Sequence, residues 1–175
     1  MASAPRVIDD FLDRELFLLL QAKLLAPSFA WEESAILSEK AAAHLAPSEN
    51  VQQVHGFYLV KRGIRFSSPT LEILRPVINK LNPLALLKAK ANRTARTDRH
   101  IEYGLHVDTR RPGATTAIFY LNTNNGYTLF GDGQQVASVE NRIVIIGAAT
   151  LHTGASCTDA EYRMVLNLNL MLAAP

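Results

Sequence analysis

Cysteine and long apolar runs are scarce in this chain, and their scarcity excludes several classes of protein. Among 175 residues there is one cysteine, Cys157, so an internal disulfide is excluded and nothing indicates an oxidising compartment. The longest apolar runs, such as LFLLL at residues 16–20, are far shorter than the roughly 20 residues of a membrane-spanning helix. The N-terminal segment lacks the charged-then-apolar order of a signal peptide. We therefore expect a cytoplasmic protein without a membrane partner.

Charge is also modest. Charged residues make up 19% of the chain, and the net charge of +2 is too small to indicate a nucleic-acid partner by itself. Hydrophobic residues make up 48%, a proportion typical of a globular protein and not of a disordered one. A chain of this length corresponds to about one domain, and we find no repeat, low-complexity tract or linker. We expect a single domain over residues 1–175.

The first part of the chain predicts two helices. Asp13 can cap a helix that ends before Pro27, and its apolar face is expected to consist of Leu16, Leu19, Leu20 and Leu24. Ser68 and Pro69 are typical of a second helix start, and Pro76 should kink that helix or shift its boundary. Its predicted apolar stripe consists of Leu71, Leu74, Ile78 and Leu81. Between the helices, residues 28–56 suggest a short helix with loops, and residues 56–62 predict a strand.

From about residue 86 the apolar period changes from 3.6 to 2, which predicts strands separated by turn sequences. The expected strands cover residues 86–94, 101–109, 115–123, 126–130, 134–139, 141–147 and 163–172. This order favours a mainly β (α+β) domain. A helical front of about residues 1–84 would pack on one side of a β core, a barrel or sandwich, of about residues 85–172.

A possible metal site begins in the sequence GLHVDT, residues 104–109. If this segment is a strand, His106 and Asp108 point to the same face. The pair alone is weak, since a His-x-Asp triplet occurs by chance in roughly one chain in five of this length. A third ligand, His152, follows a strand that looks buried. Two imidazoles and a carboxylate suit non-haem Fe(II), and zinc accepts the same atoms.

The last strand, RMVLNLNLML, places its leucines on one face and Arg163, Val165, Asn167, Asn169 and Met171 on the other. If the second face looks into a barrel, Arg163 is a cation in a cavity of low dielectric, which is costly unless an anion meets it. Its forked donor suits a carboxylate in bidentate geometry. The alternative is that Arg163 lies at the rim and pairs with Asp159 or Glu161.

These motifs resemble those of the 2-oxoglutarate and Fe(II)-dependent oxygenases, in particular the prolyl-hydroxylase-like group. That family has a His-x-Asp pair, a distal histidine and a basic residue about ten positions later, matched by His106, Asp108, His152 and Arg163. FYLN with Tyr120 and NGYTLF at residues 125–130 resemble two further family motifs, although Asn125 replaces a glycine. The likeness is closest to the compact versions of bacterial and bacteriophage genomes. It covers roughly residues 85–172.

The resemblance implies a double-stranded β-helix, or jelly-roll, whose iron ligands are His106, Asp108 and His152. It implies Fe(II), 2-oxoglutarate as cosubstrate and O2, and leaves ascorbate open as an accessory. Arg163 would bind the distal carboxylate of 2-oxoglutarate, with the Tyr120 hydroxyl as second donor. Further candidates for facing the cofactor or substrate are Tyr103, Thr128, Asn167 and Asn92. The implied reaction is hydroxylation of a C–H bond, with release of succinate and CO2.

The substrate is not identified by the sequence. A protein or peptide side chain such as proline follows by analogy only, a small molecule stays open, and nucleic acid is less favoured although residues 93–105 and 110–111 are basic. We expect a monomer or weak homodimer in a bacterial or phage-infected cell. Two alternative functions are a cupin-like, non-oxidative metal enzyme and a catalytically silent binding module. Outside the site, we expect structural or spectator roles for Cys157, His44, His55 and His100.

Overall fold

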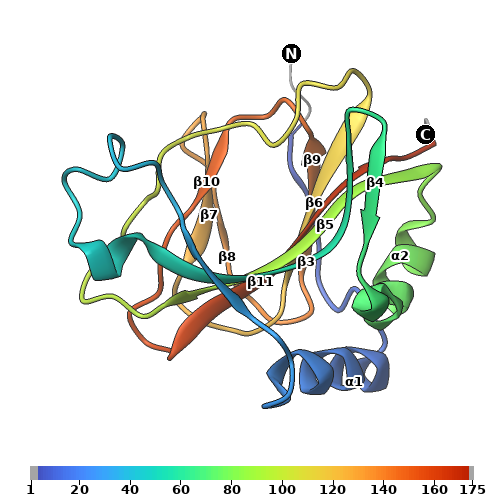
Figure 1. Cartoon of the computed structure of the whole chain (residues 1–175), viewed down its shortest axis with the longest axis horizontal. Helices are drawn as coiled ribbons and strands as arrows, with labels where there is room; N and C mark the ends of the chain where they lie inside the picture. The colour runs from blue at the N-terminus through green and yellow to red at the C-terminus, as the bar shows by residue number, and fades with distance from the viewer. Residues whose placement is uncertain (1–3, 174–175) are drawn as a thin grey trace.

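Two antiparallel sheets form the body of the protein in the computed structural model, which describes residues 4–173 (Figure 1). The larger sheet has eight strands in the order β1-β9-β6-β11-β5-β3-β2, with β4 paired to β3. Its strands are β1 (Arg6–Ile8), β2 (Glu32–Ala35), β3 (Val51–Lys61), β4 (Ile64–Ser67), β5 (Ala85–Ala95), β6 (Ala114–Tyr120), β9 (Ile143–Gly147) and β11 (Tyr162–Met171). The smaller sheet has the order β10-β7-β8, with β7 (Tyr127–Phe130), β8 (Gln135–Ala137) and β10 (His152–Gly154).

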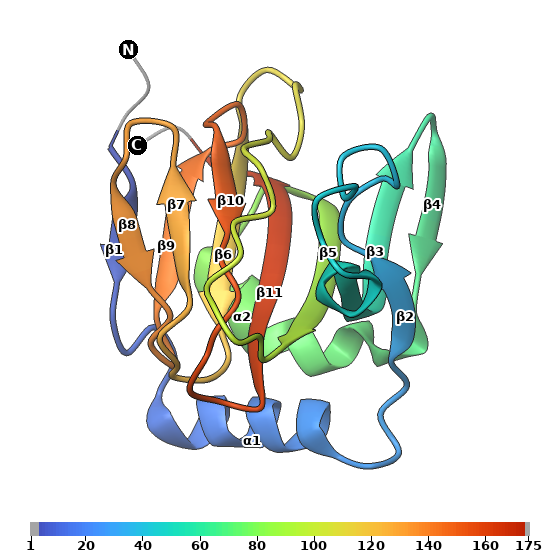
Figure 2. The ribbon, with the colours of Figure 1, turned by 90° about the vertical axis from the view of Figure 1, so that its left-hand side faces the viewer.

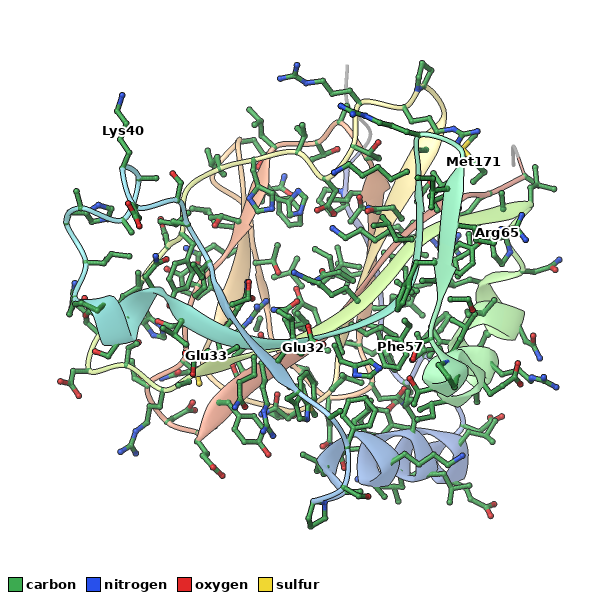
Figure 3. The ribbon with its side chains drawn as sticks, in the orientation of Figure 1. Glu32, Glu33, Lys40, Phe57, Arg65 and Met171 are labelled. Atoms are coloured by element: carbon green, nitrogen blue, oxygen red, sulfur yellow. The ribbon has the colours of Figure 1, made fainter. Side chains whose placement is uncertain are left out.

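The helices cover one face of the large sheet, and the small sheet lies in front of its other face (Figure 2). The helical elements are α1 (Arg14–Leu25), the 3-10 helices η1 (Pro47–Asn50) and η2 (Pro69–Leu74), and α2 (Arg75–Leu81). Phe57, labelled in Figure 3, is fully buried with the helix residues in the larger core. A smaller apolar cluster joins Phe130 of β7 to Ile118, Val144 and Val165 of the large sheet. No helix among the described residues is long and apolar enough to cross a bilayer.

The alternation of β11 is confirmed. Leu166, Leu168 and Leu170 lie in the core beneath the helices, whereas Arg163 and Asn167 line a cavity on the opposite face. The neighbouring strand β5 follows the same rule, because its alanines pack toward the helices and its polar side chains face the cavity. The two central strands thus separate the structural core from a polar interior.

The first helix is present, but its predicted apolar face is only half right. The residues that α1 buries are Phe17, Leu20 and Leu24, whereas Leu16 and Leu19 are 40% and 54% exposed. The buried face of α1 thus includes Phe17, whose ring packs edge-on against Phe119 of the sheet at a centroid distance of 5.9 Å. Asp13 stands at the N-cap position but makes no side-chain capping bond.

Residues 28–56 are not a short helix with loops. They contain β2, the 3-10 helix η1 and the first half of β3, and β2 pairs with β3 at the end of the large sheet. Near the N-terminus, β1 pairs with β9. The front of the chain therefore contributes four strands to the β core, so the predicted boundary near residue 84 does not separate helices from strands. The ends of the predicted domain, residues 1–3 and 174–175, lie outside the described residues.

The second helix begins as predicted, since the Ser68 hydroxyl accepts a hydrogen bond from the Thr70 backbone N–H. A 3-10 turn runs to Leu74 and α2 begins at Arg75, which places the expected break next to Pro76.

One predicted strand is wrong. Residues 101–109 form an irregular loop with two isolated bridges, of Glu102 to Ala155 and of His106 to His152. Gly104, at φ +84°, interrupts any extended run there.

Candidate metal centre and cosubstrate pocket

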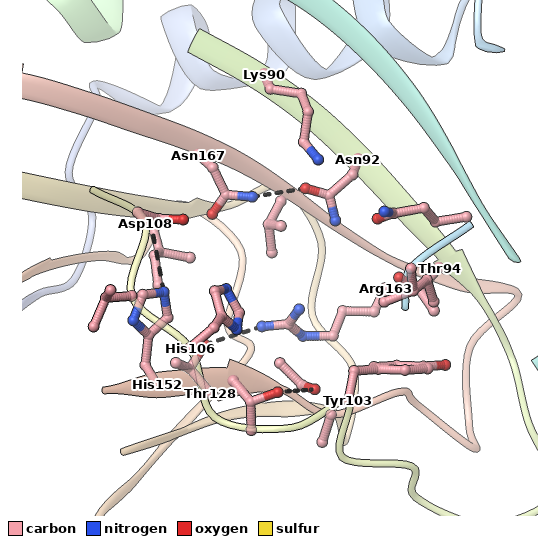
Figure 4. A pocket seen from close by; sticks show the side chains of 18 of the residues that line it. Lys90, Asn92, Thr94, Tyr103, His106, Asp108, Thr128, His152, Arg163 and Asn167 are labelled. Carbon is pink, nitrogen blue, oxygen red and sulfur yellow. Dashed lines mark hydrogen bonds and ion pairs between the residues drawn. The ribbon is translucent and has the colours of Figure 1, made fainter. Parts of the chain in front are cut away.

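A cavity of about 350 Å³ opens on the inner face of the large sheet (Figure 4). This volume lies at the small end of the range found for small-molecule sites. Its walls come mainly from β5, β7, β10, β11 and the loop of residues 96–113, and they bring together seven of the predicted site residues: His106, Asp108, His152, Arg163, Tyr103, Thr128 and Asn167. Asn92 is the eighth predicted site residue that lines the cavity. Tyr120, the ninth, does not line it.

The two histidines and the aspartate form one cluster, with one candidate ligand atom from each lying within 4.8 Å of the others. The backbones of His106 and His152 exchange two hydrogen bonds of 3.0 Å, which bring the imidazoles side by side, with ring centroids 4.9 Å apart and ring planes tilted by 44°. His152 Nε2 lies 3.7 Å from Asp108 Oδ2. The structure brings the three residues of the predicted triad together. The reason for its geometry is a bridge between a loop and β10, not the strand alternation that suggested it.

Each candidate metal ligand is oriented by a hydrogen bond to a neighbouring group. The Nδ1 atoms of His106 and His152 lie 3.2 and 2.9 Å from the carbonyl oxygens of Gly104 and Thr150, so a proton on Nδ1 leaves Nε2 free to bind a metal.

Asp108 Oδ2 accepts hydrogen bonds from the Thr116 hydroxyl at 3.1 Å and the Asn169 amide at 3.2 Å. The alternation of the last strand placed Asn169 on the correct face without a role, and no sequence signal indicated Thr116. Both act as positioning residues for the carboxylate.

The protonation states suit metal binding. Burial acts to raise the pKa of Asp108, but His152, Lys88 and the bonds from Asn169 and Thr116 outweigh it, so this pKa lies below its ordinary value. Burial lowers the pKa of His152, although the Thr150 carbonyl and Asp108 oppose the change. An ionised carboxylate beside a neutral imidazole is the state that a divalent metal requires.

Arg163 is a buried cation that lines the same cavity. Its Nε donates to Ser138 Oγ at 2.8 Å and one Nη donates to Thr128 Oγ1 at 3.1 Å, while the guanidinium carbon lies 5.5 Å from the centre of the Tyr120 ring. Burial lowers the pKa of this guanidinium. Among residues 4–173 it forms no ion pair with a carboxylate.

The proposed rim pairing of Arg163 is therefore wrong. Asp159 instead accepts a hydrogen bond from the Asn125 backbone N–H at 3.0 Å, and Glu161 forms no ion pair within the described part of the chain. A buried guanidinium satisfied only by neutral hydroxyls retains an uncompensated charge, so the site favours an anion.

The remaining candidates lie around Arg163. The Tyr120 hydroxyl donates to Thr128 Oγ1 at 2.7 Å and the Arg163 guanidinium lies over the Tyr120 ring, so Tyr120 is connected to the cavity through Thr128 and Arg163. Tyr103 lines the cavity while its hydroxyl donates to the Glu49 carbonyl at 3.1 Å, and burial raises its pKa to about 12. Asn167 donates to Asn92 at 2.6 Å across the floor of the cavity.

The predicted bystanders are outside this cluster. His55 bridges the Ala30 carbonyl and Thr70, and His100 contacts the Ser156 carbonyl. Cys157 is a buried free thiol whose pKa is raised by burial. His44 does not line the cavity.

The arrangement fits a divalent metal together with a dicarboxylate. The metal would bind the two imidazoles and the carboxylate, which leaves other coordination positions open, as in non-haem iron sites. The second carboxylate of the ligand would compensate Arg163. Gly126 and Gly154 make room for this side chain, because a β-carbon at either residue would approach Arg163 atoms to 2.7 and 3.0 Å.

Comparisons with known proteins give matches among solved structures only; no family model and no curated protein matches. A prolyl hydroxylase from Trichoplax adhaerens, in complex with a hypoxia inducible factor peptide fragment, is 12% identical with a TM-score of 0.63, covering 95% of this chain and 83% of that chain. A 2OG-Fe(II) oxygenase family oxidoreductase from Burkholderia pseudomallei is 13% identical with a TM-score of 0.64, covering 95% and 84%.

A third similar structure is the non-heme alpha ketoglutarate dependent epimerase SnoN of nogalamycin biosynthesis. It is 16% identical with a TM-score of 0.63, covering 97% of this chain and 78% of that one. These likenesses extend over nearly the whole chain at identities too low to carry function. The chain therefore has the double-stranded β-helix fold of the 2-oxoglutarate/Fe(II) oxygenases, the superfamily that its motifs resemble.

Proposed function

We propose that this protein is an Fe(II)- and 2-oxoglutarate-dependent dioxygenase that hydroxylates a C–H bond of a substrate not yet identified. The observation that carries the proposal is Arg163, a buried guanidinium without a carboxylate partner among the described residues, in the same cavity as the His106–Asp108–His152 cluster. A metal centre alone does not call for such a cation. A metal-chelating cosubstrate with a second carboxylate does.

Each residue has a defined task in this function. His106, Asp108 and His152 would hold Fe(II), and Thr116 and Asn169 fix the Asp108 carboxylate for that purpose. Arg163 would bind the distal carboxylate of 2-oxoglutarate, with the Thr128 hydroxyl beside it. Tyr120 would act by orienting Thr128. Iron and cosubstrate supply the oxidising chemistry when bound, using O2 and releasing succinate and CO2.

Two features of the chain would protect that chemistry. His152, only 4% exposed, lies between the two sheets next to the apolar cluster around Ile118 and Val165, whereas His106 is exposed. The Asn92–Asn167 pair forms the floor without presenting a group that titrates at neutral pH. The protein therefore needs no acid–base residue of its own. It binds and orients the metal, the cosubstrate and the substrate, and it limits the access of water to them.

The type of product, hydroxylated or epimerised, is part of our proposal and does not follow from the fold. One similar structure is a prolyl hydroxylase with a peptide and another is an epimerase. We favour hydroxylation, and a peptide or protein side chain such as proline as its target, by analogy with the former. Product analysis by mass spectrometry decides the outcome, because hydroxylation adds one oxygen atom and epimerisation adds none.

Anaerobic loading with Fe(II) followed by 2-oxoglutarate tests the proposal. We expect the visible charge-transfer band of the chelate and an increase in Tm that depends on 2-oxoglutarate. Metal binding without either effect would favour the cupin-like alternative, and absence of metal binding would favour the silent module. Gln134→Ala, on an exposed turn outside the cavity, is a control that should retain both effects.

A further inference from the structure

The wall that β5 contributes to the cavity carries two lysines that the proposed function does not use. Lys88 and Lys90 alternate with Ala89 and Ala91 on β5, so the lysines face the cavity while the alanines are buried beneath the helices. Figure 4 shows the Lys90 side chain directed into the cavity beside Asn92. Lysines in a strand are usually found where the side chain reaches open solvent, and these two line an interior instead.

Neither lysine has an anionic partner. Within residues 4–173, Lys88 and Lys90 form no ion pair and no side-chain hydrogen bond, and Asp108 is the one acidic residue that lines the cavity. Burial, and then the neighbouring Lys88, lower the pKa of Lys90. An ammonium group held in this way costs free energy that an incoming anion would offset.

The excess of positive charge in the cavity remains after metal and cosubstrate have bound. Arg163, Lys88 and Lys90 are three cations against one carboxylate, Asp108. A divalent metal ion and the 2-oxoglutarate dianion cancel each other, and imidazoles bind a metal ion in their neutral form. The loaded site therefore keeps an excess of two positive charges, and these belong to the lysines, because Arg163 is matched by the cosubstrate.

The register of the sheet places the lysines near the metal and away from Arg163. Arg163 is paired with Thr94, whereas Lys90 is paired with Asn167 and Lys88 with Asn169. Asn169 is the residue that donates to Asp108. Since strands rise about 3.3 Å per residue, Lys90 lies roughly 13 Å along β5 from the level of Arg163. A ligand on the lysines would be beside the metal centre and separate from the distal carboxylate of the cosubstrate.

Space next to Lys90 is also available. Its partner on β3 is Gly56, and a β-carbon there would meet only Phe66 Cε1, at 4.0 Å. The strand thus places no side chain over the ammonium group on that side.

We propose that Lys88 and Lys90 form a subsite for an anionic group, a carboxylate or phosphate, of the oxidised substrate. The subsite would hold that anion beside the metal centre and so select a small acidic substrate, or the acidic part of a larger one, over neutral molecules. This inference rests on the proposed function for its meaning, but the binding of anions by the two lysines is measurable without turnover.

The test uses ¹⁵N-labelled protein loaded with Zn(II), which accepts the same ligand atoms without redox chemistry, and with 2-oxoglutarate. Acetate, inorganic phosphate and neutral acetamide are titrated, and the amide shifts of Lys88, Lys90 and Asn167 are followed. We expect saturable shifts with at least one anion and none with acetamide, while 2-oxoglutarate stays bound. The tighter of the two anions identifies the carboxylate or the phosphate as the group recognised.

Two substitutions and a matched control complete the test. Lys90→Met and Lys88→Met remove the charge while keeping an unbranched apolar side chain, and each should weaken binding of the tighter anion about tenfold, as expected for loss of one charged hydrogen bond. Lys40→Met removes the same charge from an exposed loop distant from the cavity (Figure 3) and should change nothing.

The proposal would be overturned by shifts that do not saturate, that acetamide also produces, or that both substituted proteins retain. Displacement of 2-oxoglutarate by the anion would overturn it as well. A failure of the proposed function would be detected at an earlier step of the same experiment. In that case 2-oxoglutarate does not bind the zinc-loaded protein before any anion is added, and the anion titration, repeated on the zinc-loaded protein alone, still decides whether the lysines form the subsite.

Discussion

Gly126 packs directly against the side chain of Arg163. A β-carbon on Gly126 would lie 2.7 Å from Arg163 Cδ, 2.8 Å from Asn124 Oδ1 and 3.0 Å from the Ala155 carbonyl oxygen. The Arg163 stem is buried and the Ala155 oxygen is backbone, so neither can move away at low cost. The loop that joins β6 to β7 thus approaches β11 as closely as it does because residue 126 lacks a side chain.

Gly126→Ala should therefore displace Arg163 and weaken 2-oxoglutarate binding. Overpacking of this kind typically costs about 1–3 kcal/mol of folding free energy, which denaturant unfolding measures. The matched control is Gly147→Ala, where the new β-carbon would meet only Thr150 Oγ1 at an ordinary 3.7 Å. Equal effects of the two substitutions on 2-oxoglutarate affinity would show that the contact with Arg163 is unimportant.

Arg163→Ala should separate the binding of cosubstrate from that of metal. The guanidinium lines the same cavity as the His–Asp–His cluster but donates to Ser138 and Thr128, not to the candidate ligands. Loss of charged hydrogen bonds worth about 1.5–3 kcal/mol predicts a decrease of roughly 10- to 150-fold in 2-oxoglutarate affinity. Calorimetric titration of metal, then of 2-oxoglutarate, measures both steps. A parallel loss of metal affinity would mean that Arg163 has a structural role instead.

The β core is predictable from the sequence because its signals are local. Period-2 alternation identifies β5, β6, β7, β9 and β11, and it assigns Arg163 and Asn167 to the same face of β11, the face that lines the cavity. These strands are flanked by turns and pack against a single layer on each face, the situation in which alternation is most informative.

The failures have a common physical cause. The short strands β1 and β2 owe their structure to pairing with β9 and β3, which are distant in sequence, so their own residues carry little signal. The loop that holds His106 and Asp108 is likewise ordered by the bridge to His152. Thr116 could not be found from spacing, because its contact with Asp108 depends on the path of that loop.

Asn169→Ala should weaken metal binding although Asn169 is not a ligand. Its amide donates to Asp108 Oδ2 at 3.2 Å and to Thr116 Oγ1 at 2.9 Å, so its removal frees the carboxylate to rotate. Loss of such a partner typically costs about 10- to 100-fold in metal affinity. Asn167→Ala is the control, since it lies on the same face of β11 but bonds to Asn92. Competition with a chromophoric zinc chelator measures both; similar affinities for the two variants would contradict the positioning role.

Tyr103 should make the folded protein sensitive to alkali. Burial raises its pKa to about 12, above the ordinary value of 10, so the unfolded chain ionises this phenol at a lower pH than the folded chain does. A raised pKa contributes stability that is complete below pH 10 and is lost as the pH rises from 10 to 12. The loss should reach about 2–3 kcal/mol at the upper limit.

Tyr103→Phe removes the phenol and should flatten this part of the stability curve, since phenylalanine has no proton to lose. Near neutral pH the variant should lose only the hydrogen bond to the Glu49 carbonyl, worth about 1 kcal/mol. Urea unfolding of both proteins at intervals from pH 7 to pH 12 measures the difference. Because the other groups that titrate are common to both proteins, the gap between the two curves isolates Tyr103. If that gap stays constant above pH 10, the phenol is not held neutral by the fold.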